Sequence, residues 1–136
     1  MARNKHFPQA GDIAGAVAIE YAIILPVLLL ALLGAMDLGR LFWSYATIAN
    51  AAQTAARCFA IKAAACQTAA ATQSYAATQA YGITINASAF TVTTPACGAQ
   101  VAASYVFDFV VPWFYAIPPF GGSNSVTLST TSCYPT

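Results

Sequence analysis

AVAIEYAIILPVLLLALLGAM, residues 16–36, is an almost unbroken apolar run of about the length that the hydrocarbon core of a bilayer requires. Eleven of its residues are Leu, Ile or Val, which together favour membrane insertion by roughly 3–7 kcal/mol. Glu20 opposes insertion by about 3 kcal/mol, but it lies near one end of the run and can lean toward the interface. We therefore predict one transmembrane helix over residues 16–36.

The composition of the whole chain agrees with a membrane protein. Of its 136 residues 59% are hydrophobic and only 7% are charged, whereas about a quarter are charged in an ordinary soluble domain. A net charge of +1 gives no basic surface for nucleic acid. The single histidine, His6, precedes the apolar run, and no C-x-x-C pair is present, so we expect no metal, no cofactor, no small-molecule substrate and no enzyme activity.

The charges on either side of the run predict its orientation. Arg3, Lys5 and His6 precede it, and the next cation, Arg40, has Asp37 three residues before it. By the positive-inside rule the N-terminus is cytoplasmic, so everything after residue 36 lies outside. A cleaved secretory signal fits less well, because the run is long, contains Glu20 and Pro26, and is followed by no A-x-A site.

Four cysteines lie in the part of the chain that would be exported: Cys58, Cys66, Cys97 and Cys133. An even number in that compartment predicts two disulfides, with buried free thiols as the alternative. In one straight helix Cys58 and Cys66 would lie about 12 Å apart along the axis, which is too far for a bridge. A helix break near residues 62–66 would let them pair. Of the three possible pairings we prefer 58–66 with 97–133.

A short motif opens the apolar run. Gly15 lies at the membrane edge, and Glu20 follows five residues later inside the run. An acid in a membrane segment is by default a functional residue whose partner must be found. If the chain were cut after Gly15, a positive amine would appear at Ala16, and the free amine of a neighbouring subunit could neutralise Glu20 and set the stagger of packed helices. The structural alternatives are an acid that leans to the headgroups and an ordinary glycine at a helix edge.

These residues resemble a known family. Gly15, Glu20 and Tyr21, with Ala22 and Pro26, are similar to the start of TadE/TadG-like proteins, and the resemblance continues through 37–42 and 55–57. It implies a pseudopilin of the tight-adherence (Flp-type) pilus and secretion machinery, cut after the glycine by a prepilin peptidase. It also implies a bacterial inner-membrane location or incorporation into the pilus, with pilin-like subunits, pilus assembly proteins and membrane lipid as partners.

The helical pattern continues beyond the membrane segment to about Lys62. Apolar residues recur at spacings of three and four, which predicts one helix over 16–62 with an apolar stripe: Leu38, Leu41, Tyr45, Ile48, Ala52, Ala55 and Phe59. Two uses of the stripe remain open, as core beneath a sheet or as a seam to other pilin helices, which the small residues along it would allow.

Residues 63–136 are expected to form a small head. The pattern predicts a helix over about 67–80, stopped by Gly82, then strands over 83–85 and 90–92 with a bulge at 86–88. Further strands are predicted over 105–111 and, at an edge, over 126–133. The predicted organisation is a leader (1–15), a transmembrane segment (16–36), an extension of the helix (37–62) and the head (63–136). The fold class is a membrane-anchored, pilin-like α+β protein with a small antiparallel sheet.

An aromatic segment in the head supplies the rival hypothesis. Trp113, Phe114, Tyr115 and Phe120 lie in a proline-rich loop, which is a candidate docking site for a partner. The same residues would also suit a domain core or a belt on the lipid headgroups. In the rival reading the protein is a membrane-anchored extracytoplasmic binding module and residues 1–62 are only a tether. A tether has no use for Glu20, so this residue distinguishes the two hypotheses.

Overall fold

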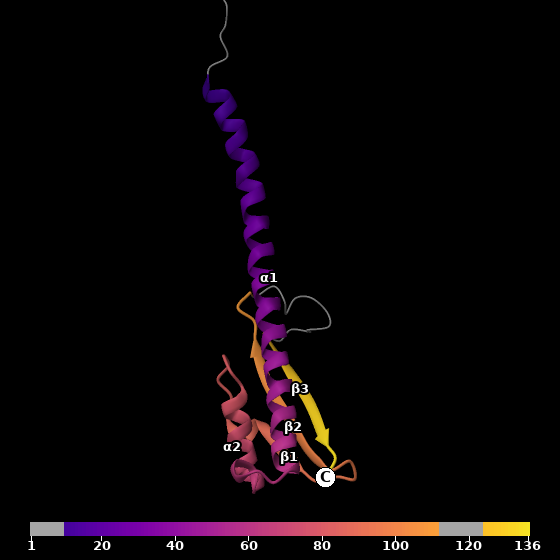
Figure 1. The fold of residues 1–136 in the computed structure, drawn as a ribbon. Helices are drawn as coiled ribbons and strands as arrows, with labels where there is room; N and C mark the ends of the chain where they lie inside the picture. The colour runs from indigo at the N-terminus through magenta and orange to yellow at the C-terminus, as the bar shows by residue number, and fades with distance from the viewer. Residues whose placement is uncertain (1–9, 112–123) are drawn as a thin grey trace, which may run out of the picture. The chain divides into compact units, whose positions relative to one another are not determined.

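The computed structural model describes residues 10–111 and 124–136, and it confirms the expected fold class (Figure 1). A long apolar N-terminal helix is followed by a second, short helix and a three-stranded antiparallel sheet, which is a pilin-like α+β arrangement. The chain forms two compact units, residues 1–36 and residues 37–136, which we call the anchor segment and the head. Helix α1, Ala10–Ala60, is continuous through the boundary and begins six residues earlier than predicted.

In the anchor segment the apolar side chains of α1 are exposed. Every Leu, Ile and Val from Val17 to Leu33 has more than a third of its surface open, and Ile23 reaches 67%. Among the described residues, one helix is long and apolar enough to cross a membrane, and it is this one. An exposed surface of this kind is stable in lipid rather than in water, so the helix suggests a membrane anchor.

The core of the head lies between α1 and the sheet. Its buried residues come mostly from the second half of α1, from α2 (Ala69–Gln79), and from strands β1 (Phe90–Thr93) and β2 (Ala99–Asp108). Most of them are alanines, which allow the helix backbone to approach the sheet closely, and Phe90 is the largest fully buried side chain. The members are Ile48, Ala51, Ala52, Ala55, Ala56, Ala76, Ala80, Phe90, Val101 and Ala103.

The predicted apolar stripe of α1 is core over only part of its length. From Ile48 to Ala55 it is buried as expected, and Phe59 is half-buried, but Leu38 and Tyr45 are 39% and 47% exposed. Asp37 and Ser44 take the buried positions instead, at 2% and 4%. The reason is that the end of β2 bonds to Asp37, so the covered face of α1 follows residues 37, 44, 48, 51 and 55 rather than the most apolar spacing.

The sheet has the order β1-β2-β3, with β3 spanning Ser125–Tyr134 and all pairs antiparallel. Val101 of β2 lies opposite Val92 of β1 and Ser132 of β3. As predicted, β3 is an edge strand. The strand predicted over 105–111 is observed at other bounds, since β2 starts at Ala99 and ends at Asp108. Beyond this end, the N–H groups of Val110 and Val111 bond to Asp37 instead of to another strand.

The predicted strand over 83–85 is wrong. These residues have no strand partner, and a 3-10 turn, Ala87–Ala89, occupies the place where a bulge was expected. Ile83 and Ile85 are partly buried against the core instead. Their alternation therefore reflects packing of an extended segment, which gives the same sequence pattern as a paired strand.

The chain reverses between the two helices, and disulfides fix this turn and the far end of the sheet. After α1, Lys62 adopts a left-handed conformation (φ 49°), a 3-10 turn runs over Ala64–Cys66, and the Thr68 hydroxyl accepts a hydrogen bond from the N–H of Ala71 to cap α2. Cys58 bonds to Cys66 and Cys97 to Cys133, with Cα atoms 5.7 and 6.3 Å apart. These are the two pairings preferred from the sequence.

Candidate functional site

The motif at the start of the apolar run lies on α1, in the anchor segment. Gly15 is exposed, and a Cβ added to it would meet no atom within 4 Å. Ala16 continues the helix, and Tyr21 is 67% exposed. Glu20 is exposed too, and among the described residues it has no hydrogen-bond or ion-pair partner. Within residues 10–111 and 124–136, the apolar helix therefore presents this carboxylate unpaired.

A second polar feature lies at the first residue of the head. The carboxylate of Asp37 is 3% exposed, and one of its oxygens accepts hydrogen bonds from the N–H groups of Val110 (3.0 Å) and Val111 (2.8 Å). Its other oxygen accepts a bond from the guanidinium of Arg40 at 3.0 Å. A buried carboxylate is costly unless it is bonded in this way. Asp37 therefore ties the end of β2 to α1, directly after the apolar run.

Arg40 also interacts with the end of β2. Its guanidinium carbon lies 5.3 Å from the centre of the Phe107 ring, within the range of a cation–π contact, while half of the side chain remains exposed. Phe107 packs edge-to-face on Phe109 with ring centres 5.3 Å apart. The Asp37–Arg40 pair was visible from its spacing in the sequence, but its bonds to Val110 and Val111 join residues more than 70 positions apart and carry no local signal.

The predicted docking residues Trp113, Phe114, Tyr115 and Phe120 lie outside the described residues. The chain on both sides of them is described. Asp37 holds the outgoing chain at Val110 and Val111, and the N–H of Phe109 donates to the carbonyl oxygen of Asn124 at 2.9 Å. Residues 109–111 are therefore bonded both to Asp37 and to Asn124.

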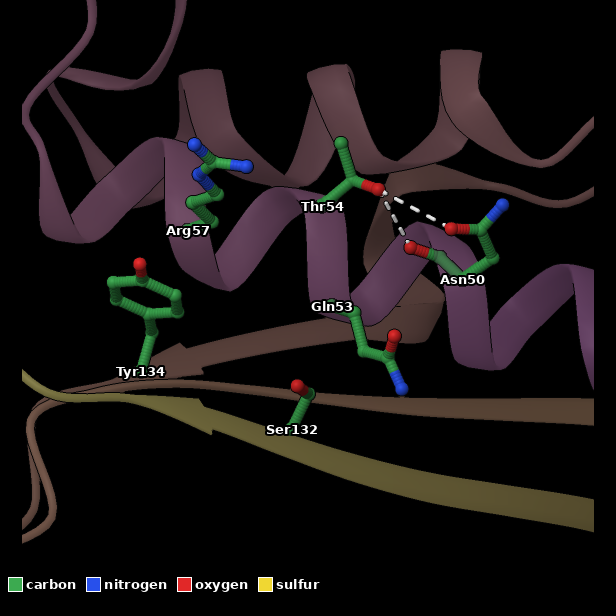
Figure 2. Close-up of a pocket in the computed structure, with 6 residues that line it drawn as sticks. All are labelled: Asn50, Gln53, Thr54, Arg57, Ser132 and Tyr134. Atoms are coloured by element: carbon green, nitrogen blue, oxygen red, sulfur yellow. Dashed lines mark hydrogen bonds between the residues drawn. The ribbon is translucent and has the colours of Figure 1, made fainter.

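A polar groove between α1 and β3 was not predicted as a site. It has a volume of about 400 Å³ and is lined by Asn50, Gln53, Thr54 and Arg57 from α1 and by Ser132 and Tyr134 from β3 (Figure 2). The Thr54 hydroxyl donates to the carbonyl oxygen of Asn50 at 2.8 Å, and the Arg57 guanidinium points away from Tyr134, with no hydrogen bond to the other residues drawn (Figure 2). The helix residues recur at spacings of three and four, the only sequence signal for the groove.

These polar groups do not form a catalytic or metal-binding arrangement in the described part of the chain. Within residues 10–111 and 124–136, no three His, Cys, Asp or Glu side chains lie together as metal ligands would. All four cysteines are in disulfides. The arrangement can instead hold a helix in lipid, present one carboxylate on that helix, and brace a small head.

A long exposed apolar helix that continues into a small disulfide-bonded α+β head is a pilin-like fold, and the disulfides suggest that the head is extracytoplasmic. Residues 15–57 match the family model described as TadE-like protein, so the chain is similar to that family over this stretch. The match implies a role in Tad pilus assembly, with other components of that machinery as partners, and proteins of this kind are structural rather than catalytic. No significant match was found among curated proteins or among solved structures.

Proposed function

We propose that this chain is a pseudopilin-like structural component in the assembly of a tight-adherence pilus or a related secretion machinery. A prepilin peptidase cuts it after Gly15, and the N-terminus faces the cytoplasm. The observation that carries the proposal is Glu20, an exposed carboxylate without a partner among the described residues, five positions after the glycine at which the family match begins.

Glu20 is proposed to bind the free amine of a neighbouring subunit. Cleavage after Gly15 creates that amine at Ala16, one helical turn before Glu20. An unpaired charge costs about 3 kcal/mol in a membrane helix, and a positive amine offsets this cost. Apolar helix surfaces give little preference among staggers in lipid, since lipid tails are as apolar as leucine. The charge pair therefore selects one stagger between neighbouring helices.

The test is assembly by Glu20 variants in the bacterium that makes the protein. Glu20→Leu should insert at least as well as the wild type, because an acid is replaced by an apolar residue, yet it should not enter pili or assembly complexes. Glu20→Asp should restore part of the assembly. Ile23→Leu, an exposed and uncharged change on the same helix, serves as the matched control. Carbonate-resistant membrane fractions report insertion, and sheared pili or cross-linked complexes report assembly.

A second function is a tethered binding module that uses residues 112–120. Its support is that the described residues on either side of this segment are bonded within the head, Val110 to Asp37 and Asn124 to Phe109. The same experiment separates the two hypotheses. Normal assembly of Glu20→Leu contradicts the stagger mechanism and favours the module. For the module, Trp113→Ala and Phe120→Ala would abolish partner binding and leave assembly unchanged.

A further inference from the structure

The exposed large apolar side chains of the head are concentrated in one region. Six of the nine that the described part of the head presents lie in three segments: the first turns of α1 in the head, the turn after α2, and the end of β2. We call this region the aromatic end; its residues are Leu38, Phe42, Trp43, Tyr45, Tyr81 and Val110.

Contacts within the head bring these three segments together. A Cβ added to Gly82 would lie 3.1 Å from the indole nitrogen of Trp43, so the turn after α2 packs against Trp43. Gly82 has φ +80°, which suits a glycine in this tight approach. On the other side, Asp37 binds the N–H groups of Val110 and Val111. Tyr81 and Val110 are therefore held beside the first turns of α1 in the head, and both are more than two-thirds exposed.

The position of the aromatic end along the chain identifies what covers it. It begins directly after Met36, the last residue of the exposed apolar run. A hydrocarbon core is crossed by about 20 helical residues, and residues 16–36 supply that length before the aromatic end begins. Trp43 and Tyr45 then follow within about three helical turns of the hydrocarbon core, at the level of the headgroups.

The chemistry of the side chains fits a headgroup layer. Trp and Tyr are enriched at membrane interfaces because an apolar ring carries a polar tip. Arg40, half exposed among them, can reach lipid phosphates, and the carboxylate of Asp37 is withdrawn into the head, where it is bonded. Asp108, the last residue of β2, is exposed and charged, and it marks the limit of the aromatic end two residues before Val110.

We propose that the aromatic end is a lipid-binding surface that seats the head on the headgroups of the bilayer. Trp43, Tyr81 and Val110, which all belong to the head, contact lipid together. The proposal rests on membrane anchorage of the apolar helix and does not require that the protein assemble into a pilus.

The test measures the depth of single tryptophans in the full-length protein. The chain has two tryptophans, so Trp113→Phe leaves Trp43 as the only one. The protein is reconstituted into vesicles of phosphatidylethanolamine and phosphatidylglycerol. A second protein carries Trp43→Phe, Trp113→Phe and Tyr81→Trp, which places the probe on the turn after α2. A control carries Trp43→Phe, Trp113→Phe and Ile61→Trp and keeps Tyr81. Its probe lies at an exposed position just after the C-terminal end of α1.

Trp43 and the tryptophan at position 81 should both show blue-shifted emission and quenching by lipids brominated near the headgroup end of the chains. Both should be protected from aqueous iodide, whereas the control should be quenched by iodide alone. Iodide quenching of the tryptophan at position 81 in the second protein, with Trp43 of the first protein quenched by the brominated lipids, would overturn the seating of the head. A second copy of the protein could cover the aromatic end instead of lipid. The two tryptophans would then be protected from both brominated lipid and iodide, and this protection would disappear as the protein is diluted with lipid. That result would also overturn the proposal. Failure of pilus assembly by Glu20 variants leaves these readouts unchanged.

Discussion

Asp37 is a buried carboxylate in the head, whose described residues include only two other buried polar side chains, Ser44 and Thr72. The cost of burying this carboxylate is offset because its oxygens accept three hydrogen bonds, two from consecutive backbone N–H groups and one from Arg40. Bonds to an ionised group are worth about 1.5–3 kcal/mol each, but most of that offsets the cost of burial. Its specific contribution is therefore positional, since it fixes where β2 ends against α1.

Removing this carboxylate should destabilise the head strongly. Asp37→Leu leaves two N–H groups and a guanidinium without their acceptor, and we expect a loss of about 3–5 kcal/mol in the free energy of unfolding. Asp37→Asn keeps one acceptor oxygen and should lose about 1–3 kcal/mol. Thermal or denaturant unfolding in detergent micelles measures both.

Arg57→Gln is the control for these variants, because it removes an exposed charge from the same helix. It should change the free energy of unfolding by no more than about 0.5 kcal/mol. Equal losses for Asp37→Leu and the control would contradict the bracing role of Asp37.

At the scale of elements, the sequence predicted what depends on local periodicity and missed what depends on distant contacts. Helix α1 followed from the spacing of its apolar residues, whereas helix α2, with its stop before Gly82, and the edge strand β3 followed from local composition. The strand over 83–85 was wrong, because an extended segment packed on the core alternates just as a paired strand does. The predicted stripe on α1 is buried only from Ile48 onward, because Asp37 occupies the buried face before it. The partners of Asp37, Val110 and Val111, follow β2 and lie too far along the chain for a local pattern to reveal them.

The two disulfides should contribute unequally to stability. Cys97 and Cys133 are 36 positions apart and Cys58 and Cys66 only eight, so the first bridge closes the longer loop. In the chain-entropy account, replacing Cys97 and Cys133 by alanine should cost about 1 kcal/mol more than replacing Cys58 and Cys66. Unfolding of the two double variants under identical micelle conditions makes the comparison. The opposite order would mean that the short bridge at the turn between α1 and α2 has a larger role than loop closure provides.

For the whole molecule, one continuous helix serves two units with different solvents. The anchor segment exposes its apolar side chains, whereas the head buries alanines of the same helix against a sheet. The boundary between residues 36 and 37 is where the apolar run ends, so composition alone places it. The motif at Gly15 and Glu20 and the family resemblance could be recognised from the sequence. The polar groove could not be predicted, because it depends on the position of β3 beside α1. The aromatic end could not be predicted either, because it depends on the positions of the turn after α2 and of the end of β2.

Processing at Gly15 can be tested without disturbing the fold. A side chain at this position meets no atom within 4 Å, and the residue is helical, so Gly15→Leu should leave the helix intact or slightly more stable. If a peptidase recognises the glycine, this variant should accumulate as the uncut chain in membranes. Electrophoretic mobility and intact mass of the purified variant distinguish the two forms. Cutting of the variant as efficient as that of the wild type would show that the glycine is not recognised.

The most direct test of the central claim is the N-terminal sequence of the protein purified from its native bacterial membrane. The account predicts a mature chain that begins at Ala16, with its new amine one turn from Glu20. An intact N-terminus in cells with an active prepilin peptidase would contradict it, and the apolar helix would then be a plain signal anchor for a tethered binding module.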